Sequence, residues 1–197
     1  MDQLVDVYKV MEEGVLFRTK LRKISYQEGK VFLSSTPLVK KFILVGDVVR
    51  LGYMNMLLPA RVVGKNDNLI VNIFYAGEGK FGDRSKPRVP VEREFGFNVL
   101  INLGGVYVTF EPVDISEGGF SVVAFDTSLV STMLGKTLNF KISGREELLG
   151  VAGTARLVGI VEDGQETKLA FETELGDASV TKIRLYVINT IKRLFSA

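Results

Sequence analysis

The stretch VYVTFEPVDISEGGFSVVAF, residues 106–125, predicts two consecutive β-strands. Val106 to Val113 and Phe120 to Phe125 are rich in β-branched and aromatic residues, which favour strands. Between them, Asp114 to Gly119 (DISEGG) carries the polar residues and glycines of a turn. The stretch therefore predicts a strand, a turn and a second strand.

The same pattern extends over most of the chain, because short runs of this kind alternate with glycine-containing turns, a spacing typical of small barrels or sandwiches. Val5 to Met11 fits a strand or a short helix, and its three valines favour the strand. The other expected strands are Val15 to Ile24, Lys30 to Ser34, Asp47 to Tyr53, Met56 to Val63, Leu69 to Tyr75, an alternating run through Phe95, Phe97, Val99 and Ile101, Thr137 to Ile142, Leu148 to Val161, and Lys168 to Glu172.

The C-terminal segment changes to the period of a helix, with apolar residues at Val180, Ile183, Val187, Ile191 and Leu194. Asp177 or Ser179 can cap the start of this helix, and the basic residues near its end suit the negative end of the helix dipole. We expect an α-helix that packs on the second of two domains.

The best domain boundary is the stretch AGEGKFGDRSKPR, which is rich in glycine and charge and poor in large apolar residues. We expect two small β-barrel domains in tandem, residues 1–76 and 89–197, joined by a linker at 77–88.

Gly77 to Gly82 matches the phosphate-binding pattern G-x-G-x-x-G, but that pattern must be followed by a helix to bind phosphate. Pro87 and Pro90 follow instead and disfavour a helix, so we interpret the glycines as linker.

The composition argues against several classes of function. Lys and Arg total 25 against 23 Asp and Glu, a balance that does not favour nucleic-acid binding. The chain has no cysteine and no histidine, so thiolate metal sites and the commonest general base are missing. We expect no catalytic residues, no enzyme activity and no metal. The lack of a leader pattern or a long apolar run predicts a cytoplasmic protein without a membrane span.

Two short segments carry the chemistry of a binding site. Arg84 and Arg88 lie four apart on a segment that Pro87 keeps extended, so they point to the same side. Guanidinium groups can bind phosphate, or the O6 and N7 atoms of guanine. On the second segment, Asp114 offers an acceptor for guanine N–H donors, Ser116 offers a hydroxyl, and glycine permits close approach of the backbone. Each segment alone also fits a solvated surface or a structured turn.

In this order, R-x-x-x-R and then D-x-S-x-x-G, the two segments resemble the signature of the PilZ family, bacterial receptors for cyclic di-GMP. The resemblance covers residues 84–172 and implies a six-stranded PilZ barrel. The implied cyclic di-GMP ligands are Arg84, Arg88, Asp114, Ser116, Gly118 and Gly119, with Lys80 and Asp83 as accessory residues. No other cofactor is implied. In the family, the residue before the first arginine influences whether one ligand or a stacked pair binds; Asp83 at that place favours one.

The first half resembles the split-barrel-like N-terminal domain of YcgR-like flagellar-brake proteins, through Phe17 to Lys20, Val31 to Pro37 and Leu44 to Asp47. This resemblance implies a receptor that changes its domain arrangement when cyclic di-GMP binds. It also implies control of motility or surface behaviour through a protein partner, such as the flagellar motor or other motility or envelope machinery.

Two other functions remain open on the sequence. A PilZ-fold adaptor could work through protein contacts alone, without ligand. The N-terminal half could also form a flavin-binding split barrel, which would make the protein an enzyme. A fold by itself does not decide among these functions.

Overall fold

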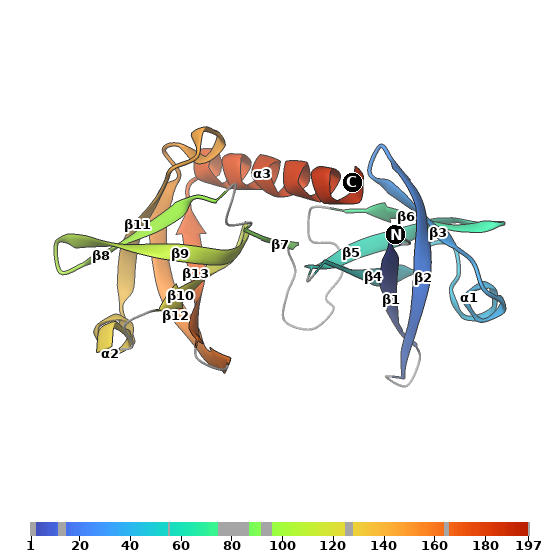
Figure 1. Ribbon diagram of the computed structural model, residues 1–197, viewed down its shortest axis with the longest axis horizontal. Helices are drawn as coiled ribbons and strands as arrows, with labels where there is room; N and C mark the ends of the chain where they lie inside the picture. Colours follow the sequence, from blue (N-terminus) through green and yellow to red (C-terminus); the bar gives the residue numbers. More distant parts are fainter. Residues whose placement is uncertain are drawn as a thin grey trace. The chain divides into compact units, whose positions relative to one another are not determined.

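The computed structural model describes residues 3–11, 15–54, 56–74, 87–91, 96–124, 128–163 and 166–196. The chain is mainly β, with two six-stranded closed barrels in tandem and a C-terminal helix, which confirms the predicted fold class (Figure 1). Its contacts divide it into two units. One comprises Met1–Pro87 with Thr190–Ala197, and the other comprises Arg88–Asn189.

The first barrel has the strand order β1-β2-β3-β6-β5-β4 and closes where β1 pairs with β4. Its first strand settles the ambiguity at Val5 to Met11 in favour of a strand, because Val5 and Val7 alternate into the core with no exposed surface. The strands are β1 (Leu4–Val10), β2 (Leu16–Gln27), β3 (Lys30–Ser34), β4 (Val48–Tyr53), β5 (Met56–Lys65) and β6 (Asn68–Ile73).

A short helix, α1 (Pro37–Phe42), follows β3 and was not predicted. The side chain of Thr36 caps it by accepting a hydrogen bond from the Val39 N–H at 3.3 Å, and Pro37 occupies the first turn. Both are ordinary helix-start signals. Val39 is buried, which anchors this short helix to the barrel.

The second barrel has the strand order β10-β13-β12-β11-β8-β9 and closes where β9 pairs with β10. Its core contains the packed rings of Phe120, Phe140 and Phe171, with centroids 5.0 and 5.2 Å from Phe120. Its elements are β7 (Arg88–Pro90), β8 (Asn98–Leu103), β9 (Val106–Ser116), β10 (Gly119–Ala124), α2 (Ser128–Met133), β11 (Thr137–Ser143), the 3-10 helix η3 (Glu146–Leu148), β12 (Ala152–Asp163) and β13 (Glu166–Leu175).

Two boundaries in this barrel correct the sequence analysis. The strand expected from Leu148 to Val161 begins only at Ala152, because η3 and Gly150, at φ +79°, turn the chain first. The turn expected at Asp114 to Gly119 is shorter, since β9 runs on to Ser116. The connection between the strands consists of Glu117 and Gly118 alone, so Asp114 and Ser116 have the alternating geometry of a strand.

The C-terminal helix α3 (Asp177–Ser196) confirms the predicted change of period. Its last turns group with the first unit, whereas we expected the whole helix to pack on the second domain. Phe195 is buried and stacks on Tyr53, with ring centroids 4.4 Å apart, and lies 5.8 Å from Tyr26. The domain limits 1–76, 77–88 and 89–197 remain predictions. No helix among the described residues is long and apolar enough to cross a membrane.

Candidate ligand-binding site

The pairing of β7 with β9 brings the two predicted motif segments together. In this antiparallel pair Arg88 lies opposite Ser116, and Pro90 lies opposite Asp114. The Arg88 guanidinium Nη1 is 3.0 Å from Asp114 Oδ1, and both side chains are about one-quarter exposed, at 24% and 26%. A cation and a carboxylate therefore meet at a half-buried place on the barrel.

Ser116 and Gly119 are fixed by the connection between β9 and β10. The two residues are register partners, and the Ser116 hydroxyl donates a hydrogen bond to the Gly119 carbonyl at 3.1 Å. A Cβ on Gly119 would lie 2.1 Å from the Phe171 carbonyl oxygen on β13, so only glycine fits this strand pairing. The glycine requirement in D-x-S-x-x-G thus has a cause within the barrel, beside any role toward a ligand.

Asp114 keeps unused capacity to accept a hydrogen bond. Its Oδ1 atom is buried and accepts no hydrogen bond of good geometry from the described residues, although it lies in ion-pair contact with Arg88. A buried acceptor without a donor is costly, and a ligand N–H group can supply one.

The tip of the connection is held by an ion pair that the sequence analysis did not identify. Arg184 on α3 donates two parallel hydrogen bonds to the Glu117 carboxylate, at 2.8 and 2.9 Å. The Glu117 side chain is only 4% exposed, and its hydrogen bonds and charge raise the pKa of Arg184 above its ordinary value. Next to it, the Gly118 carbonyl accepts a hydrogen bond from the Thr173 N–H at 3.1 Å. The connection beside the candidate site is therefore held to both α3 and β13 by hydrogen bonds.

The other predicted residues cannot be placed in this geometry. Arg84, Lys80 and Asp83 lie outside the described residues. Of the predicted ligands, the structure brings Arg88, Asp114, Ser116, Gly118 and Gly119 to one end of β9. This group offers one guanidinium, one carboxylate, one hydroxyl and backbone groups. It can bind a ligand that presents both anionic oxygens and N–H donors.

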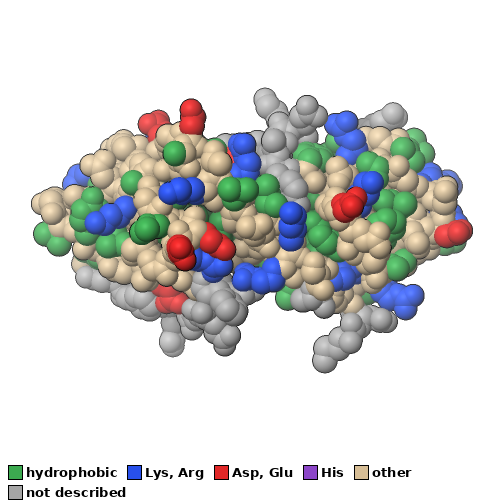
Figure 2. Space-filling view, turned by 90° about the horizontal axis from the view of Figure 1, so that it is seen from above, with side chains coloured by type: hydrophobic (Ala, Val, Ile, Leu, Met, Phe, Trp, Pro, Cys, Tyr) green, Lys and Arg blue, Asp and Glu red, His purple; other side chains and the backbone are tan. Residues whose placement is uncertain are grey.

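The face drawn in Figure 2 shows Lys and Arg side chains interspersed with Asp, Glu and hydrophobic ones, in keeping with the near-neutral charge of the chain. Among the described residues, no three His, Cys, Asp or Glu side chains gather in a group that could hold a metal ion.

Comparisons of the sequence with known proteins found one family model and one relative of nearly full length. A family described as a domain of unknown function (DUF8089) matches residues 4–73, the part that forms the first barrel. An uncharacterized protein of Aquifex aeolicus is 27% identical over 191 residues, which is 94% of this chain and 93% of that protein.

Solved structures with a similar chain path have low sequence identity. The inhibitor of motility MotI/DgrA of Bacillus subtilis is 16% identical, with 98% of this chain and 97% of that chain covered and a TM-score of 0.48. The MrkH–c-di-GMP complex of K. pneumonia is 12% identical over 98% and 88% of the chains, with a TM-score of 0.43. The PilZ domain of YcgR from Escherichia coli with c-di-GMP is 13% identical over 57% and 94%, with a TM-score of 0.46. These similarities leave the function of this chain to be argued from its own site.

Proposed function

We propose that this protein is a non-catalytic receptor for cyclic di-GMP. The observation that carries the proposal is the pairing of β7 with β9, which sets Arg88 3.0 Å from Asp114 and opposite Ser116. Arg88 and Asp114 come from the two segments on which the resemblance to PilZ receptors rests.

The charges of the site match the two kinds of group in a cyclic dinucleotide. A guanidinium binds phosphate oxygens through two parallel N–H donors, and a carboxylate accepts from guanine N–H groups. Arg88 and Asp114 pair with each other in the structure, and a bound dinucleotide would give each a partner of its own. We expect Arg84 to bind the same ligand as Arg88.

Calorimetric titration of the full chain with cyclic di-GMP tests the proposal. We expect binding by the wild type, and a loss of about one to two decades in affinity for each of Arg88→Ala, Asp114→Ala and Arg84→Ala, because a charge-assisted hydrogen bond contributes about 1.5–3 kcal/mol. Lys141→Ala is the matched control, since it removes an exposed cation from β11 of the same barrel. No binding heat with the wild type would refute the receptor and favour the ligand-independent adaptor.

Base selectivity tests the role of Asp114 separately. Guanine carries N–H donors that can bind a carboxylate, and adenine lacks donors at the matching positions. Cyclic di-AMP should therefore bind more weakly than cyclic di-GMP. Equal affinities would contradict the assignment of Asp114 to a guanine.

The absence of turnover is checked by incubating cyclic di-GMP with the protein and magnesium. We expect chromatography to recover intact cyclic di-GMP; a linear product would overturn the proposal.

The proposed output is a change in domain arrangement that a protein partner of the motility or envelope machinery detects. A ligand shifts such an equilibrium only by its different affinities for the two arrangements. Hydrogen exchange with and without cyclic di-GMP measures this. We expect protection at residues 76–88 as well as at 114–119; protection at 114–119 alone would show that the linker is not the switch.

A further inference from the structure

The residue row that contains the candidate site continues around the second barrel. Gly119 lies opposite Glu172 on β13, and Glu172 lies opposite Arg156 on β12. Opposite residues in antiparallel strands share a face, so Glu172 and Arg156 lie on the same outer face as Ser116. With strands about 4.8 Å apart, they are two and three strands away from Ser116, about 10 and 14 Å along the sheet. One ligand with two bases can reach both places.

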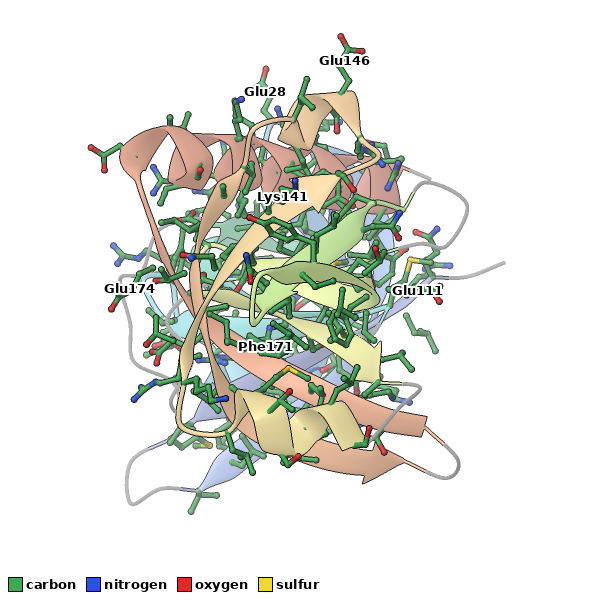
Figure 3. All side chains as sticks on the ribbon, turned by 90° about the vertical axis from the view of Figure 1, so that its left-hand side faces the viewer. Glu28, Glu111, Lys141, Glu146, Phe171 and Glu174 are labelled. Atoms are coloured by element: carbon green, nitrogen blue, oxygen red, sulfur yellow. The ribbon has the colours of Figure 1, made fainter. Side chains whose placement is uncertain are left out.

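A cavity of about 350 Å³ lies at this place, within the size range of small-molecule sites. Glu174, which Figure 3 shows at the edge of the barrel away from the core residue Phe171, is part of its wall. The polar residues that line it are Thr137, Thr154, Arg156, Glu172, Thr173 and Glu174.

One side chain of this cavity has unused hydrogen-bonding capacity. Arg156 donates from Nη2 to Glu172 Oε2 at 3.0 Å, which uses one of its five N–H donors. Both side chains of this ion pair are mostly exposed, at 63% and 60%, so the pair adds little to stability and leaves the guanidinium available.

The charges of the cavity select the kind of group that would fill it. A phosphate only accepts hydrogen bonds and carries negative charge, so the carboxylates of Glu172 and Glu174 oppose it. Guanine presents acceptors, O6 and N7, beside N–H donors, and a guanidinium pairs with O6 and N7 through two parallel bonds. A cavity that combines one guanidinium with two carboxylates therefore fits a guanine base better than a phosphate.

We propose that this cavity is a subsite for the second guanine of the ligand, in which Arg156 donates to O6 and N7 and Glu172 accepts from the N–H edge. This inference rests on the proposed function and adds a residue that determines specificity outside both motif segments. An adenine in the subsite would turn its N6 amino group, a donor, toward the guanidinium, so Arg156 discriminates between the two bases.

The test compares cyclic di-GMP with the mixed cyclic dinucleotide that carries one guanine and one adenine, by calorimetry on the full chain. We expect the wild type to prefer cyclic di-GMP by at least about fivefold, the value of one good bidentate pair. In Arg156→Ala this preference should fall to near one. Arg18→Ala is the matched control, because it removes an exposed arginine that also pairs with a carboxylate, Asp6, but on the first barrel.

The outcomes separate this inference from the proposed function. If the wild type binds neither ligand, the receptor itself is refuted. If the wild type binds cyclic di-GMP but Arg156→Ala keeps both its affinity and its preference, the receptor stands and the subsite is refuted. A loss of affinity in Arg156→Ala with the preference unchanged also refutes it, because a change in the fold alone lowers both affinities together.

Discussion

The requirement for glycine at position 119 gives a prediction whose size follows from the structure. A Cβ at this position would lie 2.1 Å from the Phe171 carbonyl oxygen, whereas carbon–oxygen contacts are ordinarily about 3.3 Å or more. Gly119→Ala must therefore push β10 and β13 apart by about 1 Å at their paired ends. The obstacle is backbone and cannot rotate away. We expect Gly119→Ala to lower the free energy of unfolding by about 2–3 kcal/mol, the upper part of the range for overpacking substitutions.

For a barrel of about 100 residues this loss lowers the midpoint of thermal unfolding by roughly 8–24 °C. Differential scanning calorimetry of the full chain would measure it on the transition of the second barrel. Gly159→Ala is the matched control: it lies on β12 of the same barrel, and its added Cβ would meet the Ala170 Cβ at an ordinary 3.5 Å. A Gly119→Ala midpoint equal to that of Gly159→Ala would refute the reasoning.

Two further predictions concern the first unit. Phe195→Ala should destabilise it by about 3–5 kcal/mol, because a buried ring stacked on Tyr53 is lost; chemical denaturation followed by tyrosine fluorescence measures this, and an unchanged midpoint would contradict it. Burial raises the pKa of Tyr53 above its ordinary 10.0. The unfolded chain therefore ionises this phenol first, so its contribution to stability is complete below about pH 10 and is lost as the pH rises through the folded value. Between pH 9 and 11 the wild type should lose more unfolding free energy than Tyr53→Phe, and parallel losses would show that the group is not responsible.

The strands of this fold were largely predictable because their signals are local. Lys30 to Ser34 was predicted with the bounds that β3 has, since the Glu28-Gly29 turn marks its start. The errors come from short elements with little hydrophobic pattern. Helix α1 has a readable start in Thr36 and Pro37, but its six residues are too few to show a helical period. The start of β12 was placed too early because Leu148 and Val151 are apolar and buried without being in a strand.

The candidate site was predictable only in part. The motif spacing identified Arg88, Asp114, Ser116 and Gly119, which lie within short stretches of sequence. The register that pairs Gly119 with Glu172 joins two strands that are far apart in the sequence, so no local sequence pattern predicts it. The contact between Arg184 and Glu117 spans 67 residues and was missed for the same reason. Sequence patterns thus indicate the motif residues, and the barrel determines which further side chains join them.

The assignment of the last turns of α3 to the first unit has a consequence for synthesis on the ribosome. Tyr53 donates a hydrogen bond to the Leu194 carbonyl, 141 residues later in the chain. At about 5–20 residues per second, roughly 7–28 s pass between the translation of these two residues. The first barrel is thus translated before the second but receives its last packing element after it. During this interval Tyr53 lacks the ring of Phe195 that stacks on it, so an apolar surface of the first barrel stays uncovered until the end of translation.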